Sequence, residues 1–447
     1  MSKLTKSFKD FLSSKSRDHG KPKEEDGNDD IAIVPDSEPE STEPNDVIDE
    51  GAFFSDITGV SEPEFKKLFE ESDMEAIQKI ITVKEEDALK GLTDVKKRSS
   101  DEGGAMYKCG AKRIMINSYN AGIFYFPTIE ELTKYAKKTK KVITETPTFH
   151  IIVPTGEDYS QVDITQVQTS RANTGATFQV ASNLNTMEPP NEETTPDDEN
   201  FVTIYLEDKT QGPMASISAA PAAISRVYCM FHNENDPSTW SQSSESQISM
   251  VSRLNDYYTT SNGYVVNYGG EKSFAEKDLD KLCQKVRIGI QYQVDAIFGK
   301  RVSGKMDKVK KPVCINQVFC AAMNEGQGES GSQNKELDAG ELKMRLLQRA
   351  CYQGTYLSAI CMKSKKLFLT LVGGGVFGNS LEIIAEEIGR AHMTIGANKK
   401  INGIVSDVYL LLYSPTEKMV DTLVKKLKEA GVELVSNDEK ITEKIKG

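Results

Sequence analysis

Apolar positions in the last third of the chain alternate between helical spacing and short unbroken runs. Helical spacing extends from a capping box at Asp338 and Glu341 to about Met362. Residues 367–372 and 408–413 are continuous apolar runs, typical of strands that are covered on both faces. The order helix, strand, helix, strand, helix predicts a layered α/β sheet.

Capping residues indicate the remaining boundaries of this region. Ser380 opens the helix that follows the first strand, and Ser414 with Glu417 has the spacing of a capping box for the next helix. Gly431 ends that helix, because glycine readily adopts the left-handed conformation found just after a helix. Residues 432–435 are a candidate final strand.

The middle of the chain carries further strand candidates and one helix. Thr128 and Glu131 form a capping box for a helix that extends to about Lys138. Residues 187–200 are acidic and Pro-rich, and residues 326–334 are rich in Gly, Ser and Gln, so both are predicted to be loops and the second to be mobile. The predicted strands are residues 113–116, 149–153, 177–182, 202–206 and 313–321.

The first hundred residues differ in composition from the rest. Residues 22–50 are acidic and poor in large apolar side chains, so they cannot bury enough surface to offset the entropy of ordering. Residues 61–98 carry helical patterning, which begins with a capping box at Ser61 and Glu64. We expect three parts: a disordered acidic tail (1–55), a small helical segment and linker (56–105), and an α/β domain (106–447). The α/β domain is expected to be a three-layer α/β/α structure with a mixed sheet.

Charge and cysteine usage narrow the function only slightly. The net charge is −12 and the pI is about 5.2. An acidic chain argues against binding of duplex nucleic acid, because such a ligand needs a basic face on the protein, although a local basic patch is still compatible with this composition. The seven cysteines include no CxxC pair and the chain has four histidines, so no metal site is predicted. Reduced, buried thiols in an intracellular, cytoplasmic protein are expected. No apolar run reaches the roughly 18 residues of a transmembrane helix.

A glycine loop between a buried strand and a helix start is the sharpest candidate site. Glycines let the backbone approach a ligand closely, and the N–H groups near a helix start favour an anion such as a diphosphate. The lack of Lys-Ser/Thr after the last glycine excludes a P-loop, and the spacing does not fit G-x-G-x-x-G. A tight turn without ligand is the alternative, but four glycines exceed what a turn needs. The loop consists of Gly373, Gly374, Gly375, Val376, Phe377, Gly378 and Asn379.

Polar residues near the predicted strand 177–182 form a second candidate region. Asn183 and Asn185 follow this strand, where they could hydrogen-bond a ribose, although Asn after a strand is commonly a turn residue. Gln211 and Gly212 begin a stretch of small residues that permits close approach of a ligand, but helix–sheet packing would explain that stretch equally well.

In order and in motifs, these segments resemble a macrodomain, the ADP-ribose-binding family, over roughly residues 150–413. Residues 162–165 match the family's Gly-Asp-Ile-Thr element, and residues 181–183 match the end of its Asn-Ala-Ala-Asn strand. Residues 375–378 match its second phosphate loop, and a Cys-Tyr pair at 351–352 lies in the long helix before that loop. The match is closer to a divergent branch related to poly(ADP-ribose) glycohydrolases than to the common type.

The resemblance implies roles for particular residues. Asp163 would accept a hydrogen bond from the adenine amino group, the backbone of Gly373 to Phe377 would hold the diphosphate, and Phe377 and Asn183 would contact the distal ribose. The whole ligand set implied comprises Asp163, Ile164, Ala181, Asn183, Gly212 and the loop from Gly373 to Asn379.

The sequence also departs from the family pattern. Val180 stands in place of the first Asn, and Gln211 with its neighbours replaces the first Gly-Gly-Gly. The Glu-Glu pair of poly(ADP-ribose) glycohydrolases has no clear counterpart, and Glu188 is the one well-placed acid. Asn183, Glu188 and Gln211 are therefore the candidate catalytic residues, and binding is better supported than hydrolysis.

Three functions remain open at this level. The chain could hydrolyse an ADP-ribosyl linkage, which requires a positioned water near the anomeric carbon. It could read ADP-ribose or an ADP-ribosylated protein without catalysis, with residues 1–105 supplying a site for a protein partner. It could also be a structural or protein-interaction α/β domain that binds no nucleotide. None of the three requires a cofactor.

Four isolated residues have competing interpretations. Cys320 and Cys351 could act as nucleophiles, but their apolar surroundings favour core thiols. His392 ends the helix after the glycine loop, where a cation would complement the helix dipole. Trp240, the single tryptophan, could anchor a loop or stack on a base.

Overall fold

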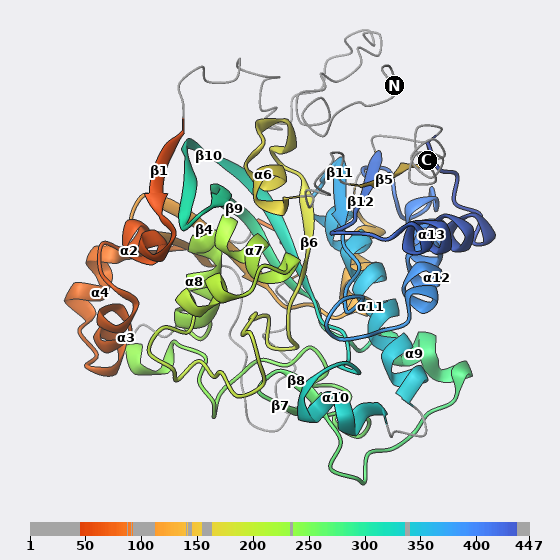
Figure 1. Cartoon of the computed structure of the whole chain (residues 1–447), viewed down its shortest axis with the longest axis horizontal. Helices are drawn as coiled ribbons and strands as arrows, with labels where there is room; N and C mark the ends of the chain where they lie inside the picture. Colours follow the sequence, from red (N-terminus) through yellow and green to blue (C-terminus); the bar gives the residue numbers. More distant parts are fainter. Residues whose placement is uncertain are drawn as a thin grey trace, which may run out of the picture.

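The protein is built around one large mixed sheet, shown in Figure 1. The computed structural model describes residues 45–86, 88–90, 92, 112–139, 141, 145–153, 163–232, 236–335 and 340–435. The order across the sheet is β2-β3-β4-β9-β10-β6-β11-β12-β5, and β1 pairs with the first part of β10. The strands are β1 Asp46–Asp49, β2 Ile81–Glu85, β3 Lys112–Ile116, β4 Tyr119–Tyr125, β5 Thr148–Ile152, β6 Thr177–Ala181, β9 Gly289–Val302, β10 Lys305–Cys320, β11 Lys366–Leu369 and β12 Asp407–Leu411; the separate hairpin is β7 Thr259–Ser261 and β8 Tyr264–Val266.

Five strands, from β10 to β5, run parallel, and the remaining pairs are antiparallel. Across the parallel half, aromatic rings at paired positions of four neighbouring strands stack on one another. Ring centroids are 4.5 Å apart between Phe178 and Phe368, 4.9 Å between Phe368 and Tyr409, and 4.8 Å between Tyr409 and His150. Because a slip of one residue would move each ring to the other face, this ladder fixes the register of the parallel strands.

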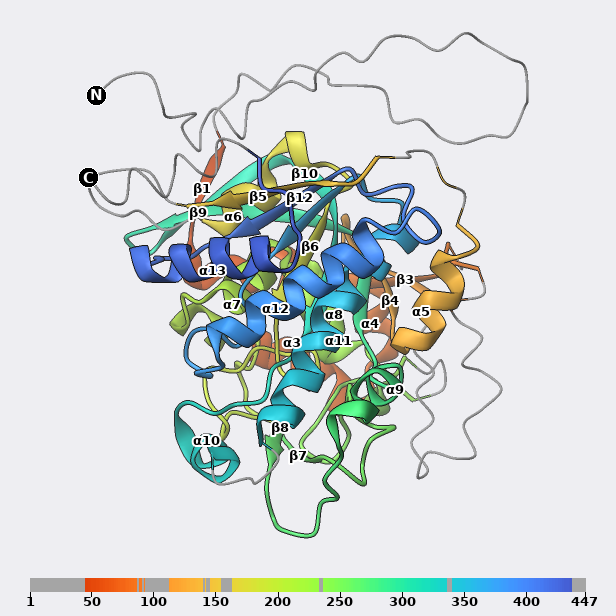
Figure 2. The same cartoon turned by 90° about the vertical axis from the view of Figure 1, so that its right-hand side faces the viewer.

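Helices cover both faces of the sheet, so the predicted three-layer α/β/α architecture is confirmed. On one face Gln179 donates to Thr355 of α11, and on the other Gln317 donates to the Ala215 carbonyl of α7. Figure 2 shows α11, α12, α13 and α5 on the near side of the sheet and α7 and α8 behind them. The helices are α2 Phe53–Thr58, α3 Glu62–Glu70, α4 Met74–Ile80, α5 Ile129–Ala136, α6 Ile164–Thr169, α7 Gln211–Ser218, α8 Ala220–Tyr228, α9 Leu279–Cys283, α10 Gly328–Lys335, α11 Gly340–Cys361, α12 Leu381–Ala391 and α13 Glu417–Glu429.

The N-terminal boundaries differ from the expected ones. The predicted tail 1–55 is described from residue 45 onward, where β1 pairs with β10 and Phe53 is fully buried. The predicted separate segment 56–105 contributes β2, which pairs with β3 of the same sheet. The segment also shares an aromatic core with the rest, since the ring of Phe65 is 5.4 Å from that of Tyr228 on α8. These residues therefore belong to the same fold, and residues 1–44 and 93–111 lie outside the described part.

Trp240 belongs to this second core. Its side chain is buried, its ring is 5.8 Å from that of Phe69 on α3, and it packs against the His232 ring at 4.1 Å. Of the two interpretations of Trp240, the structure supports the loop anchor.

Several local predictions are corrected by the structure. Residues 202–206 are not a strand: Val202 is the N-cap of the 3₁₀ helix Thr203–Glu207, which contains the other four. The predicted mobile loop 326–334 contains most of α10. Helix α13 is capped by Thr416, two residues after the predicted Ser414, because the Thr416 hydroxyl accepts from the Met419 N–H. The candidate strand 432–435 makes an isolated bridge at Leu434. The predicted cap Asp338 lies outside the described residues.

His392 does not cap a helix as a cation. It lies at the start of a π-helical turn, His392–Gly396, that continues α12, and its side chain is buried. The ring is hydrogen-bonded to the Tyr356 hydroxyl at 2.9 Å and meets the Phe149 ring edge to face. Burial lowers the pKa of His392 to about 4, so the imidazole is neutral in the folded protein.

We expect acid to destabilise the fold through His392. Its pKa is about 4 in the folded chain against an ordinary 6.5, so between these values the unfolded chain binds a proton that the folded chain does not. The free energy of unfolding should fall as the pH drops from 6.5 to 4, by up to about 3 kcal/mol from this group. Urea unfolding at a series of pH values measures the slope, and His392→Gln should flatten it; an unchanged slope in the variant would contradict the assignment.

Candidate ligand-binding site

Three loops meet at the carboxyl ends of parallel strands β6, β10 and β11. They comprise residues 182–188, 321–326 and 370–379. The Glu325 N–H donates to the Phe377 carbonyl at 2.9 Å, and the Asn379 side-chain amide donates to the Met323 carbonyl at 2.7 Å. In open α/β sheets this edge is where ligands bind.

The glycine loop is held in a closed shape by its own backbone. The Gly374 N–H donates to Leu371, the Gly378 N–H to Gly375, and the Asn379 N–H to Gly373, each at 3.0 Å. Gly373 and Gly378 have positive φ of 74° and 65°, which side chains with a Cβ rarely adopt. The predicted loop 373–379 is thus ordered by turns that require glycine at two positions.

Asn379 anchors the loop to the core. Its side-chain oxygen accepts from Gln348 of α11 at 2.7 Å, and the same Gln348 amide donates to the Val372 carbonyl at 2.8 Å. Asn379 is buried, so these bonds are shielded from water. The loop is therefore fixed before any ligand arrives.

The tip of the loop presents backbone donors. Among the described residues, none accepts a hydrogen bond from the N–H groups of Gly375, Val376 or Phe377. Gly375 and Val376 are exposed, and α12 begins directly behind them, with Ser380 as its N-cap. Consecutive free N–H groups next to a helix start favour an anion.

Aromatic and amide side chains form a wall beside the loop. Tyr264 on β8 lies 5.9 Å from Phe377, measured between ring centroids. Burial raises the pKa of Tyr264 to about 12, and the Asn183 side chain nearby acts in the opposite direction. Asn183 is itself only 5% exposed, and among the described residues its side-chain amide nitrogen has no hydrogen-bond partner. The sequence predicted Asn183 and Phe377 but missed Tyr264, which lies far away in the chain.

Lys335 brings a positive charge toward the same loops. Its ammonium group donates to the Gly326 carbonyl at 3.2 Å. Gly326 lies directly against the Val376 backbone, because a Cβ at Gly326 would be 1.8 Å from the Val376 carbonyl oxygen. A sequence interpretation that treated residues 326–334 as a mobile loop could not place this cation.

Gln211 and Gly212 clamp helix α7 to the end of β6. The Gln211 side chain donates to the Gln179 carbonyl at 2.8 Å and accepts from the Ala181 N–H at 3.0 Å. A Cβ at Gly212 would lie 1.9 Å from the Ala181 carbonyl oxygen, so only glycine fits. The Gln211 amide, predicted as catalytic, is therefore committed to the backbone of β6.

Glu188, another predicted catalytic residue, lies in a buried ion pair. Its carboxylate is 3.4 Å from the Arg226 guanidinium, and the two side chains are 2% and 1% exposed. Burial raises the pKa of Glu188 to about 7, against the lowering effect of Arg226 and Ser216. Arg226 also donates to the Thr186 carbonyl and lies over the Phe319 ring. This arrangement fixes the 182–188 loop from below.

Asp163 and Ile164 are placed by α6. The Asp163 carboxylate accepts from the Thr165 N–H at 3.0 Å and from the Thr165 hydroxyl at 2.6 Å, so it caps α6. Ile164 is buried. Within the described ranges, no hydrogen bond joins Asp163 to the three loops, and its contact with adenine stays a prediction.

Cys320 and Cys351 are core thiols. Both are at most 2% exposed, and the Cys351 thiol donates to the Ala321 carbonyl at 3.3 Å. Burial raises the pKa of Cys351 well above its ordinary value, which keeps the thiol protonated and a poor nucleophile.

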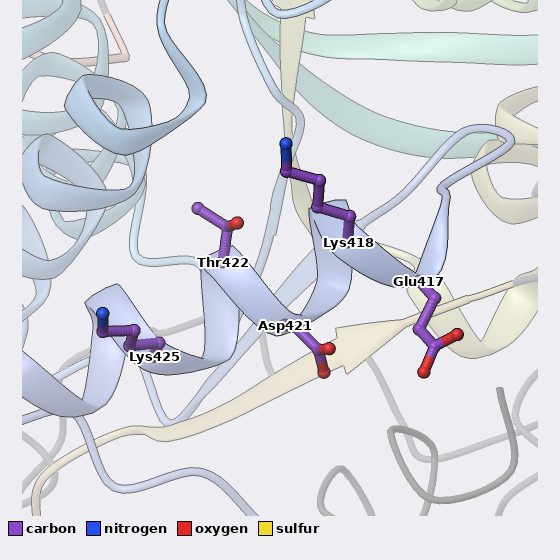
Figure 3. A pocket seen from close by; sticks show the side chains of 5 residues that line it. All are labelled: Glu417, Lys418, Asp421, Thr422 and Lys425. Carbon is purple, nitrogen blue, oxygen red and sulfur yellow. The ribbon is translucent and has the colours of Figure 1, made fainter. Parts of the chain in front are cut away.

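A hollow on the outer face of α13 is unrelated to these loops. Figure 3 shows its five lining side chains fanning out from one helix; they are Glu417, Lys418, Asp421, Thr422 and Lys425. Because a single helix face supplies all five, with acids and bases mixed, the hollow offers little to enclose a ligand. Across the described ranges, no group of three or more His, Cys, Asp or Glu side chains is placed to hold a metal ion. In the same ranges, every helix is too short or too polar to cross a membrane.

Comparison with known proteins gives structural matches alone. No protein-family model and no curated protein sequence matches the chain. Poly(ADP-ribose) glycohydrolase from Deinococcus radiodurans in complex with ADP-ribose is similar at 12% identity and a TM-score of 0.37, over 68% of this chain and 94% of that one. The poly(ADP-ribose) glycohydrolase of Thermomonospora curvata is similar at 9% identity and a TM-score of 0.35, over 68% and 85%.

Proposed function

We propose that this chain binds ADP-ribose, free or attached to a protein, with the diphosphate on the loop from Gly373 to Gly378. The observation that supports this most is the row of N–H groups at Gly375, Val376 and Phe377, for which the described residues supply no acceptor. A diphosphate offers several acceptor oxygens and negative charge, which suit both these donors and the start of α12.

The neighbouring residues suit the rest of the ligand. Tyr264 and Phe377 provide aromatic surface next to the loop, and Asn183 provides an amide that could bond a ribose hydroxyl. Lys335 lies close enough to add positive charge beside the phosphates.

Binding without fast hydrolysis is the form of the proposal that the side chains favour. The Gln211 amide is held by β6, and Glu188 is paired with Arg226 beneath the surface. Asn183 remains as the polar side chain that could position a water. Hydrolysis of an ADP-ribosyl linkage is therefore the second candidate, and turnover of an ADP-ribosylated protein tests it.

Titration calorimetry of ADP-ribose into the full chain tests the proposal. A Cβ at Gly375 meets nothing within 4 Å, so Gly375→Glu should fold normally and place a carboxylate where the diphosphate would lie. We expect saturable binding to the wild type. In Gly375→Glu the affinity for ADP-ribose should be lower by about a hundredfold or more, because the carboxylate repels the diphosphate and blocks its place.

Gly375→Ala is the matched control, because it adds the same Cβ without the charge. It should bind within a few-fold of the wild type, as expected for a methyl group in open space. If the folded wild type binds no ADP-ribose at millimolar concentration, the proposal is wrong and a structural or protein-interaction domain is the better account.

A further inference from the structure

A cavity of about 350 Å³ lies at the opposite end of the parallel strands from the glycine loop. Residues 169–171 come just before β6 begins, and residues 309–311 lie on β10 before its pairing with β6 starts. The cavity is therefore at the amino ends of the parallel strands, whereas the glycine loop is at their carboxyl ends. In Figure 1 this edge is marked by α6 and β10, away from α10 and the β7–β8 hairpin.

The lining of this cavity is strongly basic. The charged lining residues are Arg171, Lys300, Lys310, Lys311 and the single acid Asp307. Gly299 forms part of the floor, where a Cβ would lie 3.4 Å from the Thr169 hydroxyl and 3.5 Å from the Asp307 Cβ. The charged side chains that line the cavity are thus four bases and one acid, on a chain whose net charge is −12.

An acidic segment of the same chain is joined directly to the cavity. Residues 24–44 hold nine Asp and Glu residues and no Lys or Arg. The segment is followed directly by Asn45, which is one of the residues that line the cavity. Its 21 residues could extend to roughly 70 Å, so length does not limit its access to any of the four bases.

We propose that residues 24–44 dock in this basic cavity and compete there with other polyanions. Attachment at Asn45 keeps the carboxylates at an effective concentration of about millimolar or more, so individually weak contacts can hold the segment. Several carboxylates exchange among the four bases, and the association weakens with salt. A nucleic acid or another polyanion reaches the bases only after displacing the segment.

Zero-length carbodiimide cross-linking of the full chain, read by peptide mass spectrometry, tests the docking. The reagent joins carboxylates to amines in direct contact. We expect cross-links from residues 24–44 to Lys300, Lys310 and Lys311, and their strong reduction in 1 M NaCl, where the screening length is about 3 Å. Lys418 on α13 is the internal control for chance encounter. Cross-links to Lys418 as frequent as those to the cavity lysines would overturn the proposal.

A competition experiment provides the second readout. A full-chain variant with all nine acids of residues 24–44 changed to Asn or Gln should bind a single-stranded oligonucleotide at least about tenfold more tightly than the wild type, because a tethered competitor is removed. The gain should disappear when Lys310→Gln and Lys311→Gln are added. Equal affinity of the wild type and the neutralised variant would mean that the cavity is open to external polyanions, and the docking would be disproved.

Discussion

Replacing Arg226 with leucine is expected to lower the free energy of unfolding by about 3–5 kcal/mol, the usual cost of breaking a buried ion pair from one side. Arg226 is 1% exposed, and its guanidinium group bonds the Thr186 carbonyl and the Ser216 hydroxyl, each at 2.9 Å. Its guanidinium carbon lies 3.8 Å from the centre of the Phe319 ring. Leucine keeps part of the packing but leaves Glu188 buried without its counter-charge.

The pH dependence of this loss separates charge from packing. The pKa of Glu188 is already raised to about 7 by burial, and loss of Arg226 raises it further. In the variant the folded chain keeps a proton that the unfolded chain releases above about 4.5, so its stability falls as the pH rises. Chemical denaturation should show a larger deficit at pH 8 than at pH 5.

Glu188→Gln in the Arg226→Leu background is the control. It removes the unpaired acid, so the double variant should lose the pH-dependent part of the deficit and retain the packing part. A deficit in Arg226→Leu of under 1 kcal/mol, equal at both pH values, would show that the pair does not hold the 182–188 loop.

Elements fixed by nearby residues could be predicted from the sequence. The capping boxes at Ser61 and Thr128 form as expected, because their partners are three residues away. The buried strands β6, β11 and β12 and the glycine loop between strand and helix also follow from local patterns. The glycine loop could be recognised because its shape depends on its own backbone.

Elements fixed by distant residues could not be predicted in this way. Residues 202–206 have strand-like composition, but the buried Glu62 carboxylate accepts from the N–H groups of Val202 and Thr203, across about 140 residues, and holds them in a 3₁₀ turn. Helix α10 has poor helix formers, yet Glu192 accepts from the Ser330 N–H and hydroxyl in its first turn. In both cases a buried or half-buried acid supplies the bond that the local sequence lacks.

The candidate site also contains residues of both kinds, some recognisable from local sequence and others brought in by distant contacts. Asn183 and the glycine loop were placed by motif, whereas Tyr264, Lys335 and Gly326 join them through tertiary contacts. Arg226 gave a weak signal as a lone base within a stretch of small and apolar residues. The structure shows that Arg226 is the ion-pair partner of the buried Glu188.

Gly326 offers the second large effect, on ligand binding rather than on stability. In Gly326→Ala the new Cβ would lie 1.8 Å from the Val376 carbonyl oxygen, so the tip of the glycine loop must move by an ångström or more. The tip is exposed and can shift without opening a core cavity, so the free energy of unfolding should fall by no more than about 1 kcal/mol. A displacement of this size in a positioning loop can cost about a hundredfold in the interaction that it supports.

Calorimetry with ADP-ribose should therefore show an affinity at least tenfold lower in Gly326→Ala, because the N–H donors are misplaced. The melting temperature of the variant should stay close to that of the wild type. Gly375→Ala adds the same methyl group to the same pair of loops in open space, and it should leave both quantities almost unchanged. If the wild type binds and Gly326→Ala binds equally well, the N–H groups of Val376 and Phe377 are not the donors, and the ligand is held elsewhere along the strand ends. If Gly326→Ala instead unfolds, the contact between residues 321–326 and the glycine loop is a support of the sheet edge itself, and the rigidity of the loop is part of the fold's stability.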